Sequence, residues 1–310
     1  MVLVSLLYIS NEDSFLKRIT STGTTTTTSS GVAAAVLPSP TPPSPAPPPA
    51  AAAVLPSPTP PSPAPPQAAA APPPPSPSSC TPNPEFDGKY LSQSREDQAM
   101  FELFYSSPLK CGGTFVEIGA LDGINFSNSF FFEKYLGWKS LLVEANPMNF
   151  EQLEKNRPNA QNVHAAVCPG EKGVEFIWTS DKWGKSATGG VKEDMFEGHQ
   201  NAWVRPDHNT ETVPCRTWGE LFKTSGITHV DVFVIDVEGA ELTVLSVMDW
   251  SVTVDYFIIE MIPAEEAKER NQQIHELLGE HGYKEMDIKL KDWCLPNKDC
   301  TWNTLFSKGE

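Results

Sequence analysis

A glycine-containing turn with two acidic residues follows a strongly apolar run of the chain. The run Glu117-Ile-Gly-Ala-Leu-Asp-Gly123 ends a candidate strand, and glycine there lets the backbone approach a ligand closely. A dinucleotide site would need glycines at 121 and 124, where the chain has leucine and isoleucine, so NAD and FAD are disfavoured. S-adenosylmethionine has no phosphate and tolerates this looser turn, although a plain strand–turn–helix junction would give the same pattern. We assign five of these residues to cofactor binding: Glu117, Gly119, Ala120, Asp122 and Gly123.

A second acidic residue, Glu144, ends the next apolar run, 21 residues past Gly123. A carboxylate at the end of the second strand can accept hydrogen bonds from both hydroxyls of a ribose. A surface glutamate at a strand end is the alternative. Its position beside the first motif favours cofactor binding.

Three further acids lie within six residues, in Asp236-Val-Glu238-Gly-Ala-Glu241. They repel one another unless a cation lies nearby. The sulfonium and ammonium of S-adenosylmethionine would supply that charge, so we assign Asp236 and Glu241 to its methionine end. A divalent metal is an alternative, because carboxylates are also its ligands, but we assign no metal ligand. Glu238 and Glu241 could instead only favour the N-terminus of the next helix.

These residues must be positioned by strands and helices that alternate from about residue 85. Apolar runs predict buried strands at 114–118, 140–144, 162–167, 174–178, 231–236 and 254–260. Helical patterns follow at 94–104, 126–136, 147–156, 217–225, 240–248 and 264–281. This alternation predicts an α/β fold with a doubly wound, mostly parallel sheet. Residues 283–288 and 303–306 would form an antiparallel hairpin at the sheet edge. Ligands bind at the carboxyl ends of such strands, where all three motifs lie.

Residues 180–212 interrupt the alternation and show no clear periodicity. An insertion of this length in a compact domain is usually functional or mobile. It contains Trp183, Trp203, Arg205 and His208, which could stack on and orient a sugar or, as is more common, only anchor a loop.

The chain divides into a leader at 1–84 and a domain at 85–310. The leader holds 22 of the 30 prolines, and a Pro/Ala/Ser-rich segment occurs twice in it with a period of 18 residues, from Ala33 and from Ala51. Proline removes backbone donors, so we expect a disordered, extended spacer. Val2 to Ile9 is apolar but too short to span a bilayer. We expect membrane association only if this run is the remnant of a signal-anchor that starts upstream.

Charge and cysteines limit the partners. The four charged residues of the leader cancel, so the net charge of -16 lies on the domain. Such an acidic surface repels phosphate backbones, so we expect no nucleic-acid partner. None of the six cysteines has zinc-site spacing. An even number would suit disulfides or six reduced thiols equally. Cys294 and Cys300 flank a short polar loop and are the best candidate pair.

These motifs resemble the FkbM family of class I S-adenosylmethionine-dependent methyltransferases. The family's first strand carries an acid, a Gly-Ala pair and a later glycine, matching Glu117, Gly119, Ala120 and Gly123. Its second strand has an acid before a proline-containing turn, as Glu144 to Pro147 does, and its fourth strand matches Asp236 to Glu241. The resemblance covers about residues 90–306 and implies a seven-stranded Rossmann-like methyltransferase sheet.

Within that superfamily the chain is similar to the Star group. The similarity lies in Leu91 to Asp97, Phe115 to Gly123, Phe126 to Ser129 and Leu136 to Trp138. Members of that group face the lumen of the secretory pathway and assist the trafficking of growth-factor precursors. The resemblance therefore implies disulfides and residence in the endoplasmic reticulum, Golgi or endosomes rather than the cytoplasm.

The FkbM resemblance implies O-methylation of a hydroxyl on a glycan or small molecule. A hydroxyl nucleophile benefits from a base, and Asp236 is the first candidate, with Glu238 and His208 behind it. The alternative function is a non-catalytic trafficking or adaptor protein with the same fold.

Overall fold

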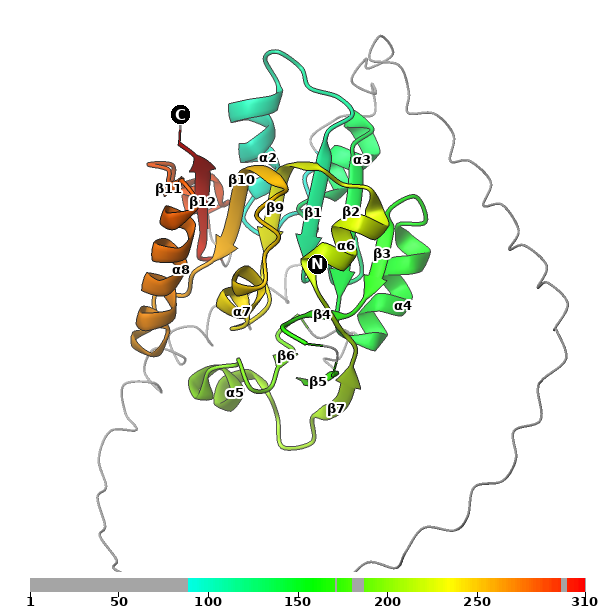
Figure 1. Cartoon of the computed structure of the whole chain (residues 1–310), viewed down its shortest axis with the longest axis vertical. Helices are drawn as coiled ribbons and strands as arrows, with labels where there is room; N and C mark the ends of the chain where they lie inside the picture. Colours follow the sequence, from blue (N-terminus) through cyan, green and yellow to red (C-terminus); the bar gives the residue numbers. More distant parts are fainter. Residues whose placement is uncertain (1–88, 171, 180–186, 297–299, 310) are drawn as a thin grey trace, which may run out of the picture. The chain divides into compact units, whose positions relative to one another are not determined.

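The computed structural model describes residues 89–170, 172–179, 187–296 and 300–309 (Figure 1). The predicted leader and Trp183 lie outside these residues. Within the described ranges, no helix combines the length and apolar composition needed to cross a membrane.

Seven strands form the central sheet, in the order β11-β12-β10-β9-β1-β2-β3 (Figure 1). The parallel strands are β1 (Thr114–Ile118), β2 (Lys139–Glu144), β3 (Gln161–His164), β9 (His229–Ile235) and β10 (Thr253–Glu260). At one edge, β12 (Asn303–Lys308) pairs antiparallel with β10 and with β11 (Tyr283–Glu285). The predicted fold class is confirmed. Because β1 lies beside β9, the switch point where such sheets bind ligands falls between them.

Helices cover both faces of the sheet. The first face packs against α6 (Trp218–Ser225), α7 (Glu241–Ser246) and α8 (Lys268–Glu280). The second packs against α2 (Glu96–Met100), the π-helix η2 (Phe101–Tyr105) and α3 (Phe130–Leu136). Side chains alternate along β1, so Val116 and Ile118 join the first core and Phe115 joins the second. Glu117 therefore points toward the second face, near the start of α3.

Local capping signals set two helix starts. Asn146 accepts a hydrogen bond from the Met148 amide at 3.0 Å and begins α4 (Pro147–Asn156). Thr217 and Glu220 form a capping box at the start of α6. Both helices were predicted with these bounds and are confirmed.

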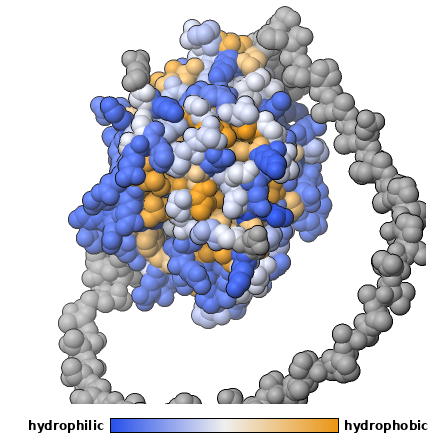
Figure 2. All heavy atoms as spheres, in the orientation of Figure 1, coloured by the Kyte–Doolittle hydropathy of each residue, from blue (hydrophilic) through white to orange (hydrophobic). Residues whose placement is uncertain are grey.

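On the face shown in Figure 2, hydrophobic side chains gather at the centre and hydrophilic ones dominate the periphery.

Other predicted boundaries were wrong, for tertiary reasons. The helix predicted from residue 126 starts at Phe130, because Ser127 and Ser129 turn toward Glu117. The helix predicted from Ser94 starts after Arg95, whose φ is 64°, while the Ser94 hydroxyl accepts from the Thr301 amide.

Three further elements are interrupted. The predicted third strand breaks at Ala165 into β3 and β4 (Ala166–Val167). The long helix predicted at 264–281 begins as the 3-10 turn η3 (Glu265–Ala267) before α8. In the predicted edge hairpin, the 3-10 turn η4 (Leu290–Trp293) lies between β11 and β12.

The predicted insertion is not structureless from residue 187 onward. It contains β6 (Gly190–Val191), α5 (Glu197–Trp203) and β7 (Asn209–Val213), and β6 and β7 flank β5 (Val174–Trp178) in an antiparallel sheet. Next to it, β4 pairs with β8 (Cys215–Arg216).

Two disulfides cross-link described residues. The predicted Cys294–Cys300 bond is confirmed, with Cα atoms 5.9 Å apart. Cys168–Cys215, which the sequence did not predict, ties β4 to β8 with Cα atoms 5.6 Å apart. None of the described cysteines is a free thiol.

The core depends strongly on Trp218, which is fully buried, packs edge-on against Phe233 with ring centroids 4.8 Å apart, and donates its indole N–H to the Val244 carbonyl. We expect Trp218→Ala to lower the free energy of unfolding by about 3–5 kcal/mol. Trp302→Ala is the control, because Trp302 is 40% exposed and should change stability by less than about 0.5 kcal/mol. Denaturant unfolding measures both, and equal losses would contradict this view of the core.

Candidate cofactor and active site

A cavity of about 190 Å³ opens at the carboxyl ends of β1, β2, β9 and β10. Four of the predicted cofactor residues line it: Glu117, Gly119, Glu144 and Asp236. Glu238 also lines it, together with residues for which the sequence analysis had assigned no role: Phe126, Asn128, His199, Glu260 and Trp302.

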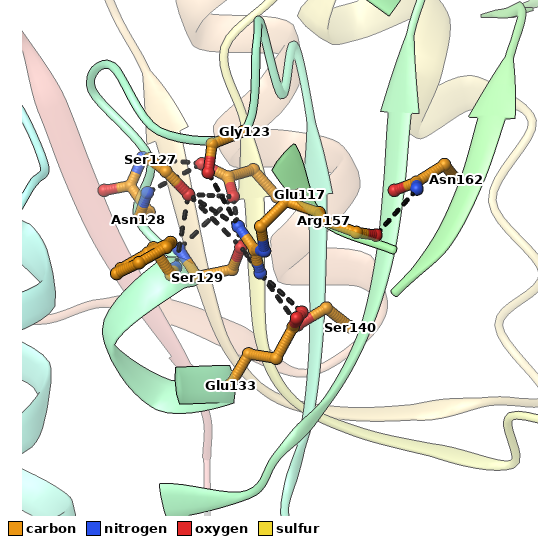
Figure 3. Close-up of polar contacts among 10 residues, drawn as sticks. Glu117, Gly123, Ser127, Asn128, Ser129, Glu133, Ser140, Arg157 and Asn162 are labelled. Carbon is orange, nitrogen blue, oxygen red and sulfur yellow. Dashed lines mark hydrogen bonds and ion pairs between the residues drawn. The ribbon is translucent and has the colours of Figure 1, made fainter. Parts of the chain in front are cut away.

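Glu117 is buried in a ring of donors from the segment before α3 (Figure 3). Its carboxylate accepts from the amides of Asn128 and Ser129 at 2.7 and 3.2 Å, and from the hydroxyls of Ser129 and Ser127 at 2.5 and 3.1 Å. Four donors compensate the loss of water around one charge. Glu117 thereby holds the backbone from residue 127 to 129 against the end of β1.

Arg157 supports the same loop from behind (Figure 3). Its guanidinium donates to the Gly123 carbonyl at 3.1 Å and to the hydroxyls of Ser127 and Ser129 at 3.2 and 3.1 Å. It also forms an ion pair with Glu133 of α3 at 2.6 Å. A buried cation shared among these groups fixes the turn after β1 to α3 and α4.

Gly119 is where the ends of β1 and β9 come closest. Its φ is +83°, and a Cβ built there would lie 1.9 Å from the Asp236 carbonyl oxygen. The Asp236 amide donates to the Ile118 carbonyl at 3.2 Å, which joins the two strand ends. Only glycine fits this position.

Glu144 closes the other side of the turn. Its two oxygens accept from the amides of Leu121 and Asn146, at 2.8 and 2.7 Å. Burial raises the pKa of Glu144 to about 7. The side chain of Asn149 and the amide of Ala145 also hydrogen-bond to this carboxylate, which faces the cavity.

Three predicted cofactor residues shape the turn but do not line the cavity. Ala120 is buried against Leu142 and Leu153. Asp122 accepts from the amides of Ile124 and Asn125 at 3.1 and 2.8 Å. Gly123 faces Arg157, and a Cβ there would lie 2.6 Å from that side chain.

Glu241 is also outside the cavity lining. It is fully buried, forms an ion pair with Arg270 of α8, and accepts from the amides of Val237 and Gly239 at 3.3 and 3.1 Å. Its charge is therefore compensated by protein groups. Glu241 shapes the turn after β9, as its alternative assignment to the start of the next helix anticipated.

His208, a predicted catalytic candidate, is not among the cavity residues. It lies before β7, where its Nδ1 is 3.0 Å from the Arg205 carbonyl. Another histidine of the insertion, His199, is buried and lines the cavity. The insertion has no clear periodicity that would distinguish the two histidines.

Asp236, Glu238 and Glu260 form a cluster in the cavity wall. One oxygen from each lies within 4.8 Å of the others. Burial raises the pKa of Asp236 to about 7 and the pKa values of Glu238 and Glu260 well above the usual range, and mutual repulsion adds to each rise. Glu260 could not be assigned to the site from its sequence position, because only the sheet order shows that β10 ends beside β9.

The cavity residues fit S-adenosylmethionine. The absence of a Cβ at Gly119 leaves the strand end open to a ligand, and Glu144 offers an acceptor for ribose hydroxyls. Oδ1 of Asn128, which lines the cavity, is buried without a hydrogen-bond partner. Such atoms need a donor or cation, which the ammonium and sulfonium of this cofactor supply.

Gly119→Ala tests the close approach of the two strand ends. We expect a loss of more than about 4 kcal/mol in the free energy of unfolding, because backbone atoms must move apart. Gly112→Ala is the control: it also has positive φ, but nothing lies within 4 Å of its added Cβ. The control should cost only about 1–2 kcal/mol. Similar losses in chemical denaturation would show that the two strand ends are not tightly apposed.

Comparisons with known proteins agree with this geometry. Residues 117–285, more than half of the chain, match the methyltransferase FkbM domain. No curated protein sequence matches significantly.

Among solved structures, fibrillarin from Aeropyrum pernix with natively bound S-adenosyl-L-methionine has 13% identity and a TM-score of 0.35, covering 64% of this chain and 67% of its own. Precorrin-6y C5,15-methyltransferase from Geobacter metallireducens has 12% identity and a TM-score of 0.36, covering 72% and 93%. A TehB-like S-adenosylmethionine-dependent methyltransferase from Corynebacterium glutamicum has 10% identity and a TM-score of 0.35, covering 68% and 94%. On the strength of the domain match, the chain belongs to the FkbM methyltransferase family, with S-adenosylmethionine as its cofactor.

Proposed function

We propose that this protein is an O-methyltransferase that acts on a hydroxyl of a glycan or small molecule. The observation that carries the proposal is the cluster of Asp236, Glu238 and Glu260 in the cavity wall. Glu117, Glu144 and Glu241 accept hydrogen bonds from backbone amides, whereas no N–H donor among the described residues bonds these three carboxylates. Asp236 and Glu260 hydrogen-bond to each other, and all three acids line the cavity, where a ligand can reach them.

Asp236 is the proposed base. S-adenosylmethionine, when bound, supplies an electrophilic methyl group. Asp236 lies directly after β9, beside Gly119, and can take the proton of an acceptor hydroxyl on a carboxylate oxygen. Glu238 is the second candidate, and the cavity walls orient the acceptor and keep water away.

Aromatic side chains of the cavity fit an acceptor that contains a ring. Phe126 and Trp302 line the cavity and are 47% and 40% exposed, and Trp203 lines it as well. Phe126 has φ of 60°, a rare conformation outside glycine that turns up at functional sites. The net charge of -16 supports a small-molecule or glycan acceptor over nucleic acid.

The disulfides support residence in the secretory pathway, where such bonds persist. This agrees with the similarity to the Star group. The similarity to the Star group also favours a second candidate function, that of a non-catalytic trafficking or adaptor protein. The hydrogen bonds that Glu117 accepts from its neighbouring loop support that alternative. They show that this acid can hold the loop in place without a ligand.

Calorimetry with S-adenosylmethionine tests cofactor binding. We expect saturable binding to the full chain and at least about tenfold weaker binding to Glu144→Ala, because a hydrogen bond to a charged group contributes about 1.5–3 kcal/mol. Glu151→Ala is the control, since Glu151 is exposed on α4 and pairs with Lys155 at the surface. Circular dichroism checks that the variants fold. No binding to the wild-type protein at millimolar cofactor would defeat the proposal.

Methyl transfer itself is tested with a labelled donor and a panel of glycans, diols and phenols. We expect Asp236→Asn to lower kcat by about 10²–10⁴, the contribution of a positioned base. A protein that binds the cofactor but methylates no acceptor would support the non-catalytic alternative.

A further inference from the structure

We propose that Asp236, Glu238 and Glu260 bind a divalent cation of the Mg²⁺, Mn²⁺ or Ca²⁺ class at the carboxyl edge of the sheet. Binding of the cation stands on the geometry alone. Its role, holding the acceptor, rests on the proposed methyl transfer.

The three carboxylates converge from two neighbouring strands. Asp236 and Glu238 follow β9, and Glu260 is the last residue of β10. One oxygen of each lies within 4.8 Å of the others, close enough for a single ion to bridge them. Glu238 reaches this position with φ of 56°, a backbone conformation that a glutamate adopts at a cost.

The positive charge of Arg270 lowers the pKa values of Glu238 and Glu260, but by less than burial raises them. The nearby guanidinium of Arg270 is bound to Glu241. Oε2 of Glu260 is buried and has no hydrogen-bond partner. A buried carboxylate oxygen without a hydrogen-bond partner, beside two further acids, favours the binding of a positively charged ligand. The reason is that isolated buried charge is costly.

His199 borders the cluster. It is 4% exposed, and its Nε2 lies 3.1 Å from the Thr188 carbonyl, which can only accept a hydrogen bond. In the neutral ring, Nδ1 then carries the lone pair, and it lies 3.5 Å from Glu238 Oε2. The neutral ring therefore presents a lone pair, and no positive charge, to Glu238.

The ligand set selects the class of cation. Carboxylate oxygens suit Mg²⁺, Mn²⁺ and Ca²⁺, whereas zinc sites favour nitrogen and sulfur. Three protein ligands would leave coordination positions for oxygens of the acceptor. An acceptor with two adjacent oxygens, such as a vicinal diol of a sugar or a catechol, could bind through both. Each protein carboxylate has two oxygens, so Asp236 can hold the ion with one and face the hydroxyl with the other.

A second cluster in the described residues provides a matched control. His229, Asp231 and Asp255 also meet the geometric condition, at the opposite ends of β9 and β10. There Asp231 already pairs with Lys110 and accepts from the Thr114 amide at 2.7 Å. Because its charge is compensated, we expect no cation to bind tightly at this cluster.

Titration with Mn²⁺, followed by electron paramagnetic resonance on the full chain without S-adenosylmethionine, tests the proposal. We expect one saturable site in the wild-type protein. Glu260→Gln should weaken it by more than about tenfold, the loss that even an outer-sphere partner can cause. Asp255→Asn should leave it unchanged. If Glu260→Gln does not fold by circular dichroism, Glu238→Gln replaces it with the same expectation.

No saturable Mn²⁺ binding to the wild-type protein would overturn the proposal, as would unchanged binding in the folded cluster variant or an equal loss in Asp255→Asn. The readout needs neither cofactor nor acceptor. A protein that binds S-adenosylmethionine but not Mn²⁺ would refute the cation site alone, and the opposite result would refute cofactor binding alone.

Discussion

Burying a carboxylate requires a compensating partner, and this requirement organises the carboxyl edge of the sheet. Glu117 is compensated by amides and hydroxyls of the loop before α3, and Glu241 by Arg270 and two amides. These pairings fix the turns after β1 and β9. Asp236 and Glu260 line the same cavity, and within the described ranges neither carboxylate accepts a hydrogen bond from an N–H group. The acids that bind protein donors therefore stabilise the site, whereas Asp236 and Glu260 can bind a ligand.

The architecture of the site follows from that separation. Gly119 brings β1 so close to β9 that the turns after both strands face one cavity. Arg157 binds the Gly123 carbonyl and Glu133 and so restrains the turn after β1. The groups of this turn that face the cavity are thereby held in position. Catalysis by positioning needs this kind of rigidity, because methyl transfer depends on alignment of donor and acceptor.

Local chemistry made part of the molecule predictable from sequence. Asn146 caps one helix and Thr217 another, and both helices have the predicted bounds. The motifs also predicted Glu144 and Asp236 at one edge of the sheet, because alternating strands and helices fix which strand ends meet, and both residues line the cavity. Contacts between distant segments were not predictable. The Ser127–Ser129 segment gives up helical structure to bind Glu117, and Glu260 joins the site only through the sheet order.

The cavity at the ends of β1, β2 and β9 is the site that we assign to the cofactor. A crystal structure of the protein with S-adenosylhomocysteine tests it most directly. We predict the ribose hydroxyls within hydrogen-bond distance of Glu144 and the amino-acid end beside Gly119 and Asp236. The product bound elsewhere, or absent from this cavity at saturating concentration, would contradict the account.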